Sequence, residues 1–160
     1  MLGIDEKEAK YPLHSRVVAH EIQGHGISQL INSEISEGIF TCIEMIHPEN
    51  YGPPLHTHTK EDELFIVVQG EYKFQIGDKI TEHKAGDIIF GPRNIKHTFM
   101  SKGNNGKTLV LTAPAGFEEY FPAVSKLPKE NFPEALKELN KKFGISFVGS
   151  PLAKAKFWQS

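Results

Sequence analysis

The most informative stretch of the chain is GPPLHTHTKEDELFIVVQG, residues 52–70, where two histidines and an acid separate a Gly-Pro-Pro turn from an apolar run. His56 and His58 are two residues apart, and on an extended chain alternate side chains share one face. Both imidazoles can therefore point at one atom inside a barrel. Glu63 begins the next apolar strand and can supply a carboxylate oxygen if that strand lies beside the histidines.

A second block, GDIIFGPRNIKH at residues 86–97, ends in a further histidine that begins another predicted strand. Three imidazoles and one carboxylate suit Fe(II), Mn(II), Ni(II), Co(II), Cu(II) or Zn(II), and they leave coordination positions open for water or substrate. The chain has one cysteine, so a closed, cysteine-rich structural zinc site is not indicated. The pattern predicts one divalent transition metal of undetermined identity, with the ligands His56, His58, Glu63 and His97.

The residues around the two blocks form short apolar runs separated by Gly, Pro, Asn and Asp, which is typical of an all-β sandwich or barrel. Several of these runs are rich in Val, Ile, Phe and Thr. The expected strands are Arg16–Ile22, Ile27–Ile35, Gly38–Ile46, Glu63–Gln69, Glu71–Ile76, Ile88–Phe90, His97–Ser101 and Lys107–Ala113.

After residue 114 the apolar residues recur at helical spacing, first in Phe117–Val124 and then in Phe132–Phe143. The tail is therefore predicted to be helical, and the stretch from residue 145 onward has no clear pattern. We expect the apolar stripe of the second helix to pack on the outside of the barrel or across a dimer contact, rather than to form a ligand pocket.

Length and composition favour one soluble domain over residues 1–160, with a barrel at about 15–114 and an extension at about 115–160. A net charge of -2 without a dense Lys/Arg run argues against nucleic acid or an anionic membrane as a partner. The N-terminus lacks the apolar core of a secretory signal and no apolar run is long enough to span a membrane, so we expect a cytoplasmic protein. Cys42 lies in an apolar stretch and is expected to be a buried thiol.

The two blocks resemble the two signature motifs of the cupin superfamily. Asn94 and Ser101 stand where the family often has Gly and Asn, but neither position is a ligand. The resemblance implies an all-β jelly-roll barrel, here with a helical C-terminal extension, and a metal held by the four residues named above. The positions that match the family spacing are His56, His58, Glu63 and Gly70 in the first motif and Gly86, Pro92 and His97 in the second.

Fold and metal do not fix a reaction, since cupins include dioxygenases, isomerases, decarboxylases and binding modules. Strand alternation turns Tyr72, Phe74 and Phe99 inward as the expected substrate-binding residues. An apolar pocket above an open metal suits a flat or aromatic ligand that chelates through neighbouring oxygens. The tail, which begins PAGFEEYF at residues 114–121, resembles that of small single-domain cupins grouped with quercetin dioxygenases.

The leading hypothesis is a quercetinase-like, metal-dependent dioxygenase, an oxidoreductase in which Glu63 is a metal ligand and also the catalytic base. A non-catalytic small-molecule-binding protein and a metal-dependent isomerase or hydrolase are the alternatives. A sugar phosphate fits less well, because strand alternation turns Lys73, Lys79 and Lys96 outward. Only Arg93, at the rim of the barrel, is then left to bind a phosphate. Single-domain cupins commonly pair through sheet edges, so a homodimer is expected.

Overall fold

The computed structural model describes residues 18–22 and 25–152. The first two residues of the predicted strand Arg16–Ile22, and the last eight residues of the predicted extension, lie outside the described residues. Within them, nine strands form one antiparallel sheet. The strands are β1 (Val18–Ile22), β2 (His25–Ile31), β3 (Thr41–His47), β4 (Leu55–His58), β5 (Asp62–Ile76), β6 (Lys79–Lys84), β7 (Ile88–Gly91), β8 (His97–Ala113) and β9 (Ile145–Gly149).

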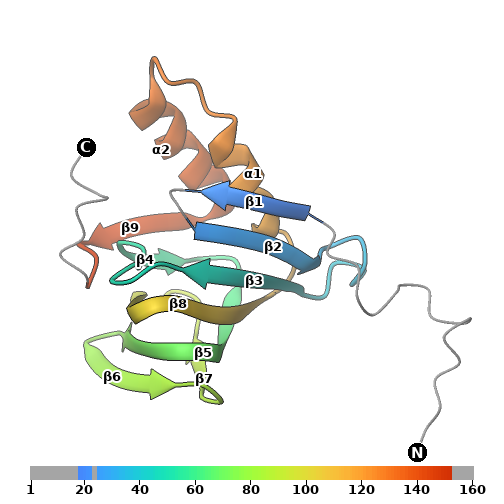
Figure 1. Cartoon of the computed structure of the whole chain (residues 1–160). Coiled ribbons are helices and arrows are strands. Elements are labelled where there is room, and N and C mark those ends of the chain that lie inside the picture. Colours follow the sequence, from blue (N-terminus) through green and yellow to red (C-terminus); the bar gives the residue numbers. More distant parts are fainter. Residues whose placement is uncertain (1–17, 23–24, 153–160) are drawn as a thin grey trace, which may run out of the picture.

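The sheet closes around two long strands. β8 pairs with β3, β4 and β5, while β5 also pairs with β6 and β7. Because β8 has partner strands along both of its edges, the sheet curls into a jelly-roll barrel. Helices occur only in the C-terminal part of the described chain (Figure 1). The predicted all-β fold with a C-terminal helical extension is confirmed. No helix of the described residues is both long and apolar enough to cross a membrane.

Two predicted strand breaks are bends within continuous strands. Gly70 has φ +88° and lies where the pairing of β5 with β8 shifts register, so β5 continues through it. Gly103 has φ +75° and lies within β8, which also continues. A bulge bends a strand without ending it, and glycine marks bulges and turns alike. The predicted strands Ile27–Ile35 and Gly38–Ile46 were too long, because residues 33–38 form turns between β2 and β3.

The hydrophobic core fills the barrel. Alternate residues of β5 are buried, as strand periodicity requires, and the free thiol of Cys42 is buried as predicted. The core residues are Ile27, Ile43, Met45, Tyr51, Phe65, Val67, Tyr72, Phe74, Ile89, Phe99 and Val110.

The C-terminal segment, residues 116–149, contains a 3-10 helix (Phe117–Glu119), α1 (Tyr120–Ser125), α2 (Phe132–Phe143) and β9. Both predicted helices are confirmed. The segment is not helical throughout, because Gly144 ends α2 with φ +74° and the chain returns to the barrel as β9. Figure 1 shows α1 and α2 at the opposite end of the molecule from β6 and β7.

Two contacts hold the C-terminal segment against the barrel. β9 pairs with β4, so that Ile145 lies opposite His58 and Phe147 opposite His56. The fully buried carboxylate of Glu118 accepts hydrogen bonds from the backbone N–H groups of Ser33 and Gly116 at 2.8 and 2.7 Å. The hydrogen bond from Ser33 joins the segment to the turn after β2, so the segment packs as part of the barrel.

The loop before β4 depends on a close backbone approach at Gly52. A Cβ atom added at Gly52 would lie 1.7 Å from the carbonyl oxygen of Phe99, whereas one added at Gly26 would find its nearest neighbour at 3.9 Å. The neighbour at Gly52 is backbone and cannot rotate away.

We therefore expect Gly52→Ala to lower the free energy of unfolding by about 3 kcal/mol or more through overpacking. Gly26→Ala should change it by less than about 1 kcal/mol. Chemical denaturation of the two variants checks this, and equal stabilities would show that the loop does not depend on the close approach.

Candidate metal centre and its pocket

The four predicted metal ligands come together inside the barrel. His56 and His58 lie on β4, Glu63 on β5 and His97 at the start of β8. All four side chains are buried, and one potential ligand atom from each lies within 4.8 Å of those of the other three. Such a group could hold a metal ion.

Strand pairing explains the convergence. His56 pairs directly with His97 across β4 and β8. Alternation along β4 places His58 on the same inner face as His56. Glu63 lies on β5, which pairs with β8. Its Oε2 is 2.6 Å from Nε2 of His97 and 3.5 Å from Nε2 of His58.

Backbone carbonyls fix the orientation of two imidazoles. Nδ1–H of His56 donates to the carbonyl of Pro54 at 2.7 Å, and Nδ1–H of His97 donates to the carbonyl of Ile95 at 2.9 Å. Since a carbonyl only accepts, Nδ1 is the donor in both contacts. Each contact leaves the other ring nitrogen, Nε2, as the atom that can face a cation.

A carboxylate orients the third imidazole. Glu61 is buried, and its Oε1 lies 2.5 Å from Nδ1 of His58. Glu61 and Asp62 are adjacent acids in the sequence. The structure separates them, because Asp62 instead pairs on the surface with Arg93 at 2.8 Å.

The electrostatics of the cluster suit a divalent cation. Burial, together with the neighbouring imidazoles, lowers the pKa of His56 to about 3, so His56 is neutral at pH 7. Burial alone would raise the pKa of Glu63, but His58 and His97 outweigh it and lower the pKa to about 2. Burial also disfavours the charged form of His58, yet Glu63 and Glu61 raise its pKa overall. A buried carboxylate among imidazoles is a donor set that suits several divalent transition metals.

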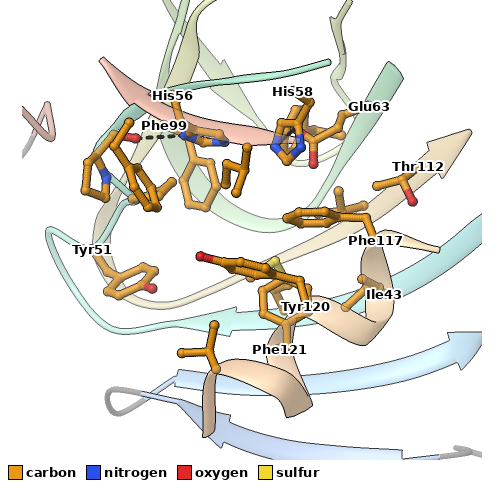
Figure 2. Close-up of a pocket in the computed structure, with 18 of the residues that line it drawn as sticks. Ile43, Tyr51, His56, His58, Glu63, Phe99, Thr112, Phe117, Tyr120 and Phe121 are labelled. Atoms are coloured by element: carbon orange, nitrogen blue, oxygen red, sulfur yellow. Dashed lines mark hydrogen bonds and ion pairs between the residues drawn. The ribbon is translucent and has the colours of Figure 1, made fainter. Parts of the chain in front are cut away.

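A cavity of about 180 Å³ adjoins the cluster. Figure 2 shows His56, His58 and Glu63 on one side of it and Tyr120 and Phe121 on the other. Most of the lining is apolar or aromatic. The barrel contributes Ile43, Met45, Tyr51, Pro53, Pro54, His56, His58, Glu63, Phe65, Phe99, Val110 and Thr112, and the C-terminal segment contributes Phe117, Tyr120, Phe121, Val124, Phe132, Leu136, Ile145 and Phe147.

Of the three predicted substrate-binding residues, only Phe99 lines this cavity. Tyr72 and Phe74 point inward as alternation predicts, but they are packed in the core. The Tyr72 hydroxyl lies 2.9 Å from Nδ1 of buried His47. Direct contact with a ligand in this cavity is therefore not supported for Tyr72 and Phe74, and substrate binding by Phe99 stays a prediction.

The eight lining residues from the C-terminal segment, called the C-terminal wall from here on, were not predicted. The expectation that the stripe of α2 avoids the ligand pocket was wrong, because Phe132 and Leu136 line the cavity. Helical spacing identifies the apolar side of a helix but not what that side faces. Within the wall, the ring of Phe117 meets the imidazole of His58 edge-on, with 4.5 Å between centroids.

Comparison with known proteins agrees with this architecture. Residues 42–113, which include all four candidate ligands, match the family model Cupin_2, described as a cupin domain. A search of the curated proteins found no match.

Solved structures share the fold at low sequence identity. KdgF from Halomonas sp. is 14% identical with a TM-score of 0.58, over 64% of this chain and 90% of that chain. An RmlC-like cupin from Shewanella frigidimarina is 18% identical with a TM-score of 0.58, over 70% and 96%. A predicted oxalate decarboxylase from Thermotoga maritima is 24% identical with a TM-score of 0.54, over 56% and 80%. Residues 42–113 are therefore similar to a cupin domain, and these solved structures share the fold of the barrel.

Proposed function

We propose that the protein is a metal-dependent, dioxygenase-like oxidoreductase that acts on a small apolar or aromatic substrate with two neighbouring oxygens. The observation that carries the proposal is that His56, His58 and Glu63 line an otherwise largely apolar cavity. A molecule in the cavity could therefore reach an ion held by the cluster. A transition metal held by these residues and His97 would bind the substrate oxygens and favour their deprotonation.

Glu63 is the proposed base. Its carboxylate is ionised at neutral pH and lines the cavity, so it can accept the proton of a substrate hydroxyl. The three histidines would still hold the ion while Glu63 does so. The surrounding aromatic side chains would exclude water and orient the substrate ring.

The basic side chains support an apolar substrate over a phosphorylated sugar. Lys73 pairs with Glu82 at 3.7 Å and Lys96 pairs with Asp78 at 2.6 Å, both on the outer surface. Lys79 is exposed, and Arg93, expected as a candidate at the rim, is paired with Asp62. None of these four basic residues lines the cavity.

A non-catalytic binding protein and a metal-dependent isomerase would use the same cavity, and oxygen consumption separates them from the proposed activity. The homodimer and the cytoplasmic location stay predictions as well. Gel filtration with light scattering tests the first, since a monomeric mass in solution would refute it.

We expect near-stoichiometric Fe, Mn, Ni, Co, Cu or Zn in the purified protein and its loss in the His56→Ala/His58→Ala variant, because removing two of four ligands leaves too few donors. Elemental analysis measures the metal, and oxygen uptake with flavonols, enediols and diketones measures the activity. Metal without uptake on any of these compounds would favour a binding protein or an isomerase. No metal, even after reconstitution, would contradict the proposed centre.

We expect Glu61→Ala to weaken metal affinity by about 10- to 100-fold, because His58 then loses the carboxylate that orients it. Asp62→Ala, the neighbouring acid that faces Arg93, is the matched control and should bind metal as the unaltered protein does. Competition with a chelator of known affinity measures both. Equal affinities for the two variants would contradict the role of Glu61.

We expect Glu63→Gln to lower turnover by about 100-fold or more, because the amide cannot accept the substrate proton. The three histidines should retain part of the metal, so turnover is measured per bound ion, from oxygen uptake and metal content on the same sample. Full turnover with full metal content would disprove the base role.

A further inference from the structure

The C-terminal wall lines the cavity both beside the metal ligands, where Phe117 meets His58, and on the side away from them. It supplies eight of the twenty lining residues in the described part of the chain, and all eight lie outside residues 42–113, which match the cupin domain. In Figure 2 the wall residues Tyr120 and Phe121 lie across the cavity from His56 and His58. The distance between these two sides limits how far a ligand can extend from the metal.

The wall is held in place at several points. The Tyr120 hydroxyl donates to Oδ1 of Asn140 at 2.7 Å, which ties α1 to α2. Phe117 stacks on Tyr120 with 5.1 Å between ring centroids. The buried carboxylate of Glu118 and the pairing of β9 with β4 anchor the two ends of the segment. A wall fixed in this way gives the cavity a defined volume.

That volume corresponds to a single ring. An apolar cavity of roughly 150 Å³ in another protein binds benzene, and the cavity beside the metal ligands measures about 180 Å³. The space suits one six-membered ring with small substituents, whereas two fused rings would fill most of it and three rings exceed it.

We propose that the C-terminal wall is a size filter, which restricts ligands of the metal centre to single-ring aromatic or similarly compact molecules. Leu136 is a specificity-determining residue of this filter. The chelating part of the ligand rests on the proposed function, whereas the size limit rests on the wall alone. The single-ring limit narrows the proposed substrates and excludes three-ring flavonols.

Two leucines of α2 allow a matched test. Leu136 and Leu139 are both partly buried and pack in the same cluster, but only Leu136 lines the cavity. Shortening either side chain removes the same atoms from the same helix. Only Leu136→Ala should enlarge the space for a ligand, and Leu136→Val should enlarge it less.

The experiment compares catechol with naphthalene-2,3-diol, which carries the same chelating diol on one additional ring. Calorimetry under nitrogen, on the Co(II)-loaded protein, should show at least tenfold tighter binding of catechol. Leu136→Ala should reduce this preference to below about threefold, Leu136→Val should give an intermediate value, and Leu139→Ala should keep it. Equal affinities in the unaltered protein, or equal effects of Leu136→Ala and Leu139→Ala, would overturn the filter.

Benzene and naphthalene, which cannot chelate, separate the filter from the metal chemistry. Ligand-observed NMR on the same variants without added metal should give the same ranking, with benzene preferred in all except Leu136→Ala. If a protein that binds no metal and consumes no oxygen still shows this ranking, the size filter is supported and the proposed activity is contradicted. Oxygen uptake with naphthalene-2,3-diol or a flavonol at the rate seen with catechol would uphold the activity and remove the filter.

Discussion

A buried carboxylate among three buried imidazoles constrains how β4, β5 and β8 meet in the barrel. A buried charge is costly unless it is compensated, and Glu63 is compensated chiefly by His58 and His97 from two other strands. This requires β4, β5 and β8 to meet in one register, with His56 opposite His97. The backbone carbonyls of Pro54 and Ile95, and the carboxylate of Glu61, then direct the imidazoles inward.

Much of this arrangement could be predicted from sequence because it follows from local rules. Two-residue alternation placed His56 and His58 on one face, and family spacing added Glu63 and His97. The C-terminal wall could not be predicted in the same way, because it depends on the pairing of β9 with β4, about ninety residues apart. No local pattern in Ile145–Gly149 names its partner strand. Likewise, Glu61 and Asp62 are adjacent acids, and only the fold turns one toward His58 and the other toward Arg93.

The candidate metal ligands and the C-terminal wall come from two different parts of the sequence. The barrel, which includes the match to the cupin domain, carries the candidate ligands, while residues 116–149 carry the C-terminal wall of the cavity. Solved structures with this fold share its architecture at 14 to 24% identity, so likeness of fold does not name a substrate. In the function that we propose, the ligands determine what chemistry is available and the wall determines which molecules reach it.

The position of the ion itself is the sharpest test of the metal centre, and anomalous X-ray diffraction at the absorption edge of whichever metal the purified protein carries measures it. We expect one strong anomalous peak within coordination distance of His56, His58, Glu63 and His97, beside the cavity. A peak elsewhere, or no peak at this cluster in crystals of reconstituted protein, would contradict the proposed centre.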